Sequence, residues 1–143
     1  MAPRKKAENK PPKQRITAAQ RADWRTLPTA DWNVRTFHAY FADMNRERYG
    51  LDYAPMRNWA FEQGALKRAI DTHGPELLRA ACEVGFAGYK PTPEYPLLTA
   101  GFAMAYQING IIPRLQAEIK RKERAESAVV NGGTSLDEML TLL

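Results

Sequence analysis

The chain has 143 residues, of which 44% are hydrophobic, so it fits one folded domain around a single core. Its apolar runs are only a few residues long, and its first ten residues, MAPRKKAENK, are mostly polar or charged. From these features we expect neither a membrane-spanning segment nor a secretory signal. They predict a cytoplasmic protein with no membrane partner. Cys82 is the only cysteine and lies in an apolar helical pattern, which excludes an internal disulfide and predicts a buried thiol.

The net charge of +5 is concentrated at one end of the chain. Residues 1–25 hold eight Lys or Arg and only two acidic residues, whereas the remaining residues hold 13 basic and 14 acidic side chains. The first part is also poor in apolar residues, so it cannot bury enough surface to offset the entropy of ordering. We therefore expect a disordered basic arm over residues 1–23 and a nearly neutral helical domain over residues 24–126.

The first elements of that domain have clear start and stop signals. The segment 24–32 carries Pro28 and two tryptophans, which predicts a turn whose rings dock onto the first helix. Asn33 is a suitable N-cap for a helix over residues 34–49, and Gly50 ends it. The predicted inward face of this helix contains Phe37, Tyr40, Phe41 and Met44.

Further helices are predicted from apolar spacing and from prolines. A second helix is expected from Pro55 to Gly74, with Met56, Trp59, Gln63, Leu66 and Ile70 on its inward face. A third helix is expected from Pro75 to Tyr89, with Leu77, Leu78, Ala81, Val84 and Gly85 inward, and residues 90–96 form a proline-rich loop. A fourth helical stretch begins near Leu97, and Pro113 predicts a kink or a break near residues 109–112.

The C-terminal end is predicted to consist of a linker and a short amphipathic helix. Residues 127–134 contain Gly132 and Gly133, and Ser135 and Glu138 have the spacing of a capping box. Residues 135–143 then present an apolar face that is suited to a protein partner, made of Leu136, Met139, Leu140, Leu142 and Leu143. Packing of this segment on its own domain is an equally good interpretation. The predicted fold class is thus all-α, a compact bundle of four to five helices between a basic arm and a short C-terminal helix.

The sequence offers little that is typical of catalysis. His38 and His73 lie in different predicted helices, and neither has a second His or Cys at metal-ligand spacing. Phosphate-binding loops of the GxxxxGK[ST] type and GxSxG elbows are absent. Asp43 and Glu47 lie four residues apart on one predicted helix, a spacing that is more typical of a solvent-exposed face than of an acid/base site. We therefore expect no enzyme activity, no cofactor and no metal.

Nucleic-acid binding is better supported by the distribution of basic residues. A flexible arm can neutralise several phosphates of DNA or RNA and release counterions without a fixed geometry. The candidate contacts of the arm are Arg4, Lys5, Lys6, Lys10, Lys13 and Arg15. A second candidate set lies near the end of the fourth helix and consists of Arg114, Lys120, Arg121, Lys122 and Arg124. The alternatives are a solubilising tail and a solvated helix end.

Three stretches of the chain resemble a known helical module. They are WNVRTFHAYFADMNRERYGLDY, LKRAIDTHGPELLRAACEVGF and YPLLTAGFAMAYQINGIIPRL. They are similar to a compact module of tailed-bacteriophage and prophage proteins, found in replication initiators and helicase-loading accessories. The resemblance implies an accessory protein that contacts a replication or transcription protein in the cytoplasm of a bacterial host. Residues 139–143, MLTLL, also resemble the short peptides with which replication proteins dock on the bacterial sliding clamp.

The sequence therefore predicts a phage-type nucleic-acid-associated adaptor, with a role as a DNA replication accessory protein. In this interpretation the arm contacts phosphates and the C-terminal segment holds a protein partner. The main alternative is a protein-interaction factor that binds and redirects a host enzyme such as RNA polymerase without binding nucleic acid. A third interpretation is a small structural or assembly protein of the virion.

Overall fold

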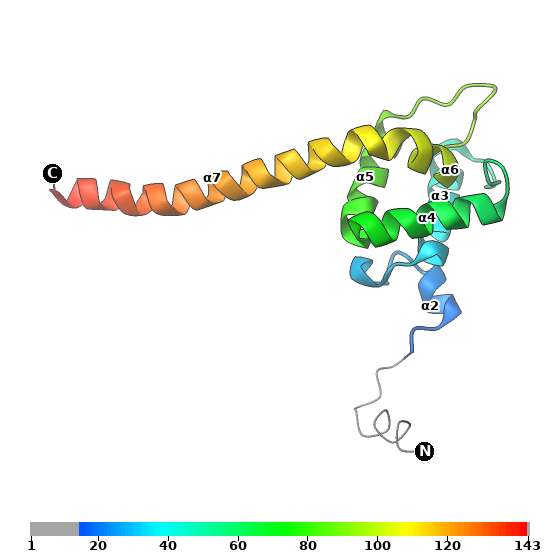
Figure 1. The fold of residues 1–143 in the computed structure, drawn as a ribbon, viewed down its shortest axis with the longest axis horizontal. Coiled ribbons are helices and arrows are strands. Elements are labelled where there is room, and N and C mark those ends of the chain that lie inside the picture. The colour runs from blue at the N-terminus through cyan, green and yellow to red at the C-terminus, as the bar shows by residue number, and fades with distance from the viewer. Residues whose placement is uncertain (1–14, 143) are drawn as a thin grey trace, which may run out of the picture.

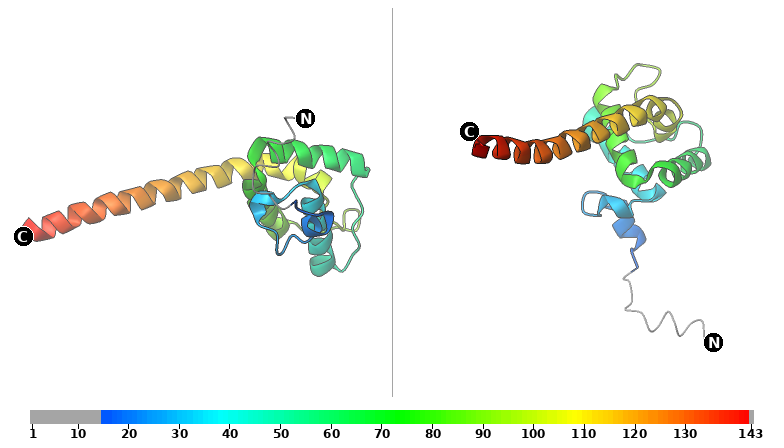
Figure 2. Two further views of the ribbon diagram at one scale, coloured as in Figure 1. Left: turned by 90° about the horizontal axis from the view of Figure 1, so that it is seen from below. Right: turned by 60° about the vertical axis from the view of Figure 1, so that its left-hand side comes forward.

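The fold is a compact helical bundle from which one long helix projects. The computed structural model describes the backbone of residues 15–142 and the side chains of residues 15–129, and within this part every regular element is helical. Figure 1 shows α3, α4, α5 and α6 gathered around the first turns of α7, which then leaves the bundle. The two further views agree that the rest of α7 has no other element beside it (Figure 2). The all-α bundle predicted from the sequence is confirmed.

The described part of the N-terminal segment is ordered, in contrast to our expectation for residues up to 23. Helix α2 spans Ala18–Ala22, and Thr17 forms a capping box with Gln20 at its start. The segment is attached to the bundle, because Arg35 Nε donates to the carbonyl oxygen of Ala18 at 3.2 Å. The disordered arm was therefore predicted too long by at least residues 17–22, where local capping supplies bonds that composition alone does not reveal.

The two tryptophans dock on the bundle as predicted. The 3-10 turn η1, Thr29–Asp31, separates them, and both indole rings are buried. Trp24 Nε1 donates to Asp43 Oδ2 at 2.7 Å, and the ring meets Tyr40 edge-on with centroids 5.1 Å apart. Trp32 Nε1 donates to the carbonyl oxygen of Leu27 at 3.1 Å. Because both N–H groups are paired, the rings bury their area without an unsatisfied donor.

Helix α3 has the bounds that its capping residues predict. It spans Val34–Tyr49, Asn33 accepts from the amide of Thr36, and Gly50 ends it with φ +69 in the left-handed region. Phe37, Tyr40 and Phe41 are buried on the predicted face. Asn45 is buried as well and joins α3 to the chain before α6, since its side chain bonds both the amide and the carbonyl of Leu98 at 2.9 Å.

Helix α4 begins later and faces differently than the sequence predicts. It spans Trp59–His73, because Asn58 Oδ1 accepts from the amide of Phe61 at 2.7 Å and so caps it there. Its buried residues are Glu62, Leu66 and Ala69. Trp59 is 48% exposed and Gln63 is also exposed, so these two residues do not face inward as predicted. Leu66 is buried as predicted, and the buried face is rotated away from Trp59 toward Glu62 and Ala69.

Helix α5 follows its predicted start closely. It spans Pro75–Gly88, begins with the proline in its first turn, and buries Leu78, Ala81, Cys82, Gly85 and Phe86. Val84, which was expected inward, is 42% exposed. The loop over residues 90–96 is confirmed and leads to Thr99, whose hydroxyl accepts from the amide of Phe102 and starts α6, Ala100–Phe102.

The last helical stretch is continuous across Pro113, so of the predicted kink or break the break does not occur. A π-helical turn, η2, spans Ala103–Gln107, and α7 then runs from Ile108 to Leu142 with Pro113 inside it. Pro113 and Asn109 are exposed, so the carbonyl that loses its N–H partner can bond to water instead.

The segment predicted as a linker, 127–134, is helical, and 135–142 is the end of α7 rather than a separate helix. A glycine inside a helix costs about 1 kcal/mol of stability relative to alanine. It ends the helix only where its own backbone adopts the left-handed conformation. Among the described residues, the glycines with positive φ are Gly50 and Gly74.

Candidate functional site

The predicted basic residues of α7 do not form a single patch. Side chains three, four and seven residues apart share one face of a helix. Arg114, Arg121 and Arg124 obey this spacing, with Lys120 beside them, and all four are exposed. We call these four residues the basic stripe. Of the acidic residues, Glu126 falls on the other side of the helix. Glu118 lies four residues after Arg114, and Glu123 lies three residues after Lys120, so the stripe is mainly cationic with one carboxylate at each edge.

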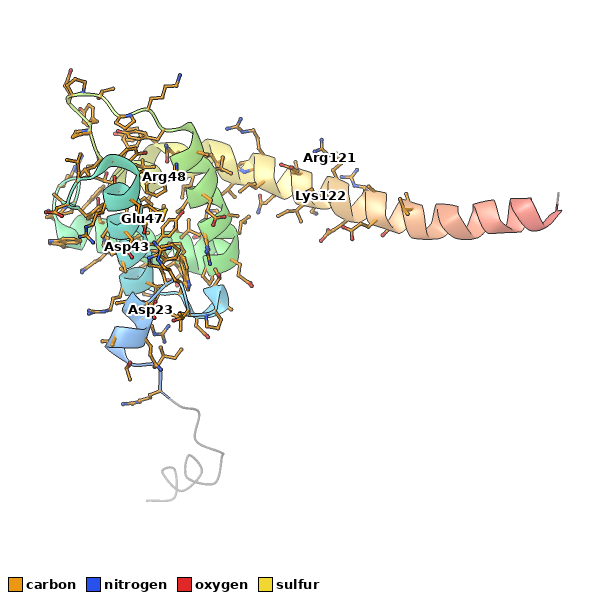
Figure 3. All side chains as sticks on the ribbon, turned by 180° about the vertical axis from the view of Figure 1, so that it is seen from behind. Asp23, Asp43, Glu47, Arg48, Arg121 and Lys122 are labelled. Atoms are coloured by element: carbon orange, nitrogen blue, oxygen red, sulfur yellow. The ribbon has the colours of Figure 1, made fainter. Side chains whose placement is uncertain are left out.

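Lys122 belongs to the opposite side of α7. It lies four residues after Glu118 and four before Glu126, which is the spacing of favourable helical ion pairs. Figure 3 shows Arg121 and Lys122 on the projecting part of the helix. The structure therefore joins four of the five predicted cations and places the fifth among carboxylates.

The other predicted contacts lie at the two ends of the chain. Arg15 is exposed and lies two residues before the Thr17 cap of α2. The predicted arm residues Arg4, Lys5, Lys6, Lys10 and Lys13 lie outside the described residues. The predicted partner-binding positions Leu136, Met139, Leu140 and Leu142 lie on the helical backbone of α7, whereas Leu143 lies outside the described residues.

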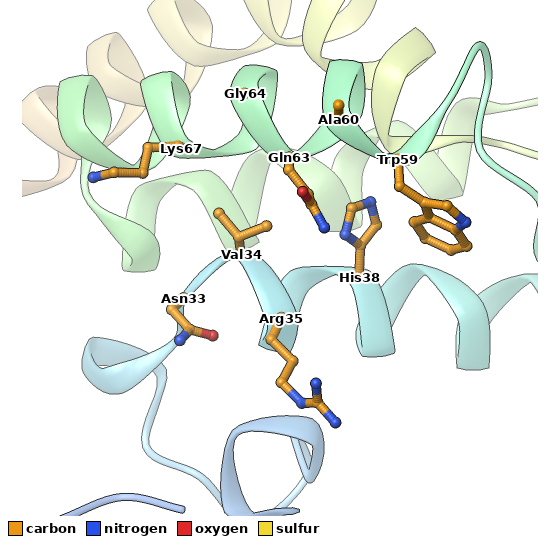
Figure 4. Close-up of a pocket in the computed structure, with 9 residues that line it drawn as sticks. All are labelled: Asn33, Val34, Arg35, His38, Trp59, Ala60, Gln63, Gly64 and Lys67. Atoms are coloured by element: carbon orange, nitrogen blue, oxygen red, sulfur yellow. The ribbon is translucent and has the colours of Figure 1, made fainter. Parts of the chain in front are cut away.

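A groove between α3 and α4 was not predicted from the sequence. It has a volume of about 750 Å³, and its walls carry Arg35 and His38 from α3 and Trp59, Gln63 and Lys67 from α4. In Figure 4 the side chains of His38 and Gln63 point toward one another across it, and the Trp59 ring stands at one end. The ionisable side chains of its wall are cationic or imidazole groups, and the wall contains no carboxylate.

Behind this groove lies a completely buried carboxylate. Glu62 is 0% exposed and accepts four hydrogen bonds. Its Oε1 accepts from His38 Nε2 at 3.0 Å and from the Tyr53 hydroxyl at 2.5 Å. Its Oε2 accepts from the backbone amides of Met56 and Gly101, both at 2.9 Å. Glu62 thus joins α3, α4, α6 and the loop between α3 and α4.

The hydrogen bonds decide the charge of Glu62. Burial raises the pKa of the carboxyl, but the bonds from His38, Tyr53, Met56 and Gly101 outweigh this effect and hold its pKa below its ordinary value. Burial, reinforced by the bond to Glu62, raises the pKa of Tyr53, which therefore stays a neutral donor. Because four donors occupy the two carboxylate oxygens, the group is suited to holding the fold and the His38 ring in place rather than to taking a proton from a substrate.

A second, more apolar pocket lies between the 51–58 loop and the loop before α6. Its volume is about 280 Å³, and Met56, Tyr89, Tyr95 and Phe102 are among its walls. Tyr89 supports this region, because its hydroxyl donates to the carbonyl oxygen of Tyr95 at 2.6 Å. The Tyr95 side chain itself is 62% exposed.

No protein family, curated protein or solved structure matches the chain. In the described part of the chain, no group of three or more His, Cys, Asp or Glu is arranged to hold a metal ion. The same part contains no helix with the length and apolar character that crossing a membrane requires.

Sequence reasoning overlooked the residues that shape the groove. Trp59 was placed on the inward face of α4 and Glu62 was not considered, because the helix was started at Pro55 rather than after Asn58 and its face was counted from Met56. One signal was available in the sequence, since Asn58 followed by an aromatic and apolar run is a suitable N-cap. With that start, positions 62, 66 and 69 share one face, and the single carboxylate among them would have stood out.

Proposed function

We propose that the chain is a nucleic-acid-associated adaptor of the phage type, which contacts the phosphates of DNA or RNA and holds a replication protein with the far end of α7. The observation that carries the proposal is the basic stripe, in which Arg114, Lys120, Arg121 and Arg124 share one exposed side of a projecting helix. An exposed helix side on which four cations outnumber the two carboxylates at its edges can lie along a sugar–phosphate backbone, and the resulting counterion release gives affinity without a defined sequence.

The shape of α7 also supports a connecting role. A helix of 35 residues is about 52 Å long, and only its first turns are packed in the bundle. Among the α7 side chains that the structure describes, up to residue 129, Leu115 is the last that packs against the core. Phosphate contacts and a partner bound near the end of the helix would therefore occupy separate stretches of the same element.

The direct test is nucleic-acid binding by a stripe variant and a matched control. Arg121→Gln/Arg124→Gln removes two charges from the stripe, whereas Arg68→Gln/Lys90→Gln removes two exposed charges from elsewhere in the domain. We expect the stripe variant to bind a fluorescein-labelled oligonucleotide about tenfold more weakly in an anisotropy titration, and the control to bind nearly as the wild type does. Equal losses in both variants would show that net charge, not the stripe, governs binding.

The alternative function, a factor that binds a host enzyme such as RNA polymerase without nucleic acid, is favoured by one observation. The pocket of Met56, Tyr89, Tyr95 and Phe102 is aromatic and apolar, as peptide-binding surfaces often are. A pull-down from bacterial lysate with and without nuclease separates the two functions. A stoichiometric partner that survives nuclease and is lost in a Tyr95→Ser variant would support the alternative, whereas a partner lost on nuclease treatment supports the adaptor.

A further inference from the structure

The groove between α3 and α4 combines an exposed aromatic ring with cationic walls. Trp59 is 48% exposed, while the other two tryptophans, Trp24 and Trp32, are 6% and 2% exposed. Arg35 and Lys67 are exposed residues of the groove wall. Figure 4 shows Lys67 at the other end of the groove from the Trp59 ring, and Arg35 directed toward α2. A groove with an exposed aromatic ring and cations along its length is suited to nucleic acid, because bases stack on the ring and phosphates pair with the cations.

We propose that this groove binds single-stranded nucleic acid, with one base stacked on Trp59 and phosphates farther along the strand beside Arg35 and Lys67. The inference rests on the proposed function and adds to it a site and a class of substrate. Single strands are favoured over duplexes because the bases of a duplex are stacked on one another and hidden from a ring at the protein surface.

The Trp59 ring is held in place before any ligand arrives. The His38 ring meets it edge-on, with centroids 5.0 Å apart, and the Tyr53 ring lies 5.8 Å away. His38 and Tyr53 are themselves fixed, because both donate to the buried carboxylate of Glu62. A platform supported in this way loses little conformational entropy when a base stacks on it. In this proposal the hydrogen bonds of Glu62 hold the Trp59 ring in place for binding, in addition to stabilising the fold.

The groove also adjoins the point where the basic arm joins the bundle. Arg35 holds α2 through the carbonyl oxygen of Ala18, and Arg15 lies three residues before Ala18. At the other side of the groove, Lys67 Nζ lies 3.1 Å from Asp71 in an exposed pair. Exposed pairs of this kind contribute little, so a phosphate can compete for the lysine. Arg15, the one predicted arm contact that the structure describes, therefore lies near Arg35 in the chain segment that Arg35 holds.

Tryptophan fluorescence of the full-length chain tests the proposal directly. Because Trp24 and Trp32 are buried, Trp59 is the ring that an added oligonucleotide can reach. We expect oligo-dT to quench the emission and to shift it, and we expect Trp59→Phe to remove most of this quenching. Trp59→Ala should weaken binding of oligo-dT by at least about fivefold, which is the lower limit for loss of one stacked base. Tyr106→Ala, at a ring that is 65% exposed on another element, is the matched control and should bind as the wild type does.

Two further probes distinguish stacking from other causes of quenching. An abasic oligonucleotide of equal length has the phosphates without the bases, and poly-glutamate represents an acidic protein partner. Quenching by oligo-dT alone supports the proposal. Equal quenching by the abasic strand or by poly-glutamate would overturn it, as would unchanged oligo-dT affinity in Trp59→Ala. If that variant keeps its affinity while the stripe variant loses it, the groove proposal fails and the proposed function stands. If the wild type binds no oligonucleotide, both fail.

Discussion

His38 and Glu62 meet at the boundary between the groove and the core, with His38 Nε2 3.0 Å from Glu62 Oε1. The carboxylate is completely buried, whereas the imidazole forms part of the groove wall. Glu62 joins α3, α4, α6 and the loop between α3 and α4, and His38 contacts the exposed ring of Trp59. Changes at Glu62 are therefore expected to alter both the stability of the fold and the shape of the groove.

Replacing the buried carboxylate should destabilise the fold. Glu62→Gln keeps the size of the side chain but places an N–H₂ group against two of the four donors, and hydrogen bonds to charged groups contribute about 1.5–3 kcal/mol. We expect the free energy of unfolding in urea to fall by about 2 kcal/mol. Glu83→Gln on the surface of α5 is the control, and its effect should be small. Equal stability of wild type and Glu62→Gln would contradict the assigned network.

The same group gives a pH dependence with a definite sign. The pKa of Glu62 is lower in the folded chain than its ordinary value of 4.5, so the folded state prefers the carboxylate. Its contribution is complete above about pH 4.5 and is lost as the pH falls through the folded pKa. The stability difference between wild type and Glu62→Gln should therefore shrink below pH 4.5 in urea titrations. A difference that stays constant from neutral pH to about pH 3 would exclude this linkage.

Asn45 should be the most sensitive polar residue of α3. Its side chain donates to the carbonyl oxygens of Phe41 and Leu98 and accepts from the amide of Leu98. Asn45→Ala leaves both backbone groups of Leu98 without these partners in the core, which should cost about 3 kcal/mol in chemical denaturation. The exposed Asn109→Ala on α7 serves as the comparison. If both substitutions cost equally little, the bridge between α3 and Leu98 is not formed in solution.

Cys82 should be unreactive in the folded protein. The thiol is 2% exposed, and burial raises its pKa, so the reactive thiolate is scarce at neutral pH. Labelling with an aromatic disulfide reagent should be slow under native conditions and complete in urea. Rapid labelling without denaturant would show that α5 opens more readily than its packing implies.

Elements with local end signals could be predicted from the sequence. Asn33 and Gly50 define α3 through a side-chain cap and a left-handed glycine, and both interactions involve only neighbouring residues. The same holds for the start of α5 at Pro75. Such elements need no knowledge of the tertiary fold.

Features that depend on distant partners could not be predicted in this way. The burial of Glu62 is made possible by donors at residues 38, 53, 56 and 101, which are brought together only by the fold. The groove follows from the resulting rotation of α4, which turns Trp59 outward. In contrast, the position of Lys122 away from the basic stripe could be predicted from helical geometry alone. This distinction was missed because the five cations were treated as one cluster.

The central claim, that the basic stripe contacts phosphates, is tested most directly by the salt dependence of binding. The association constant of wild type, Arg121→Gln/Arg124→Gln and Arg68→Gln/Lys90→Gln for one oligonucleotide should be measured between about 50 and 200 mM salt. If each arginine neutralises one phosphate, the slope of log affinity against log salt should be shallower by about 2 in the stripe variant and unchanged in the control. An identical slope in all three proteins would contradict the account.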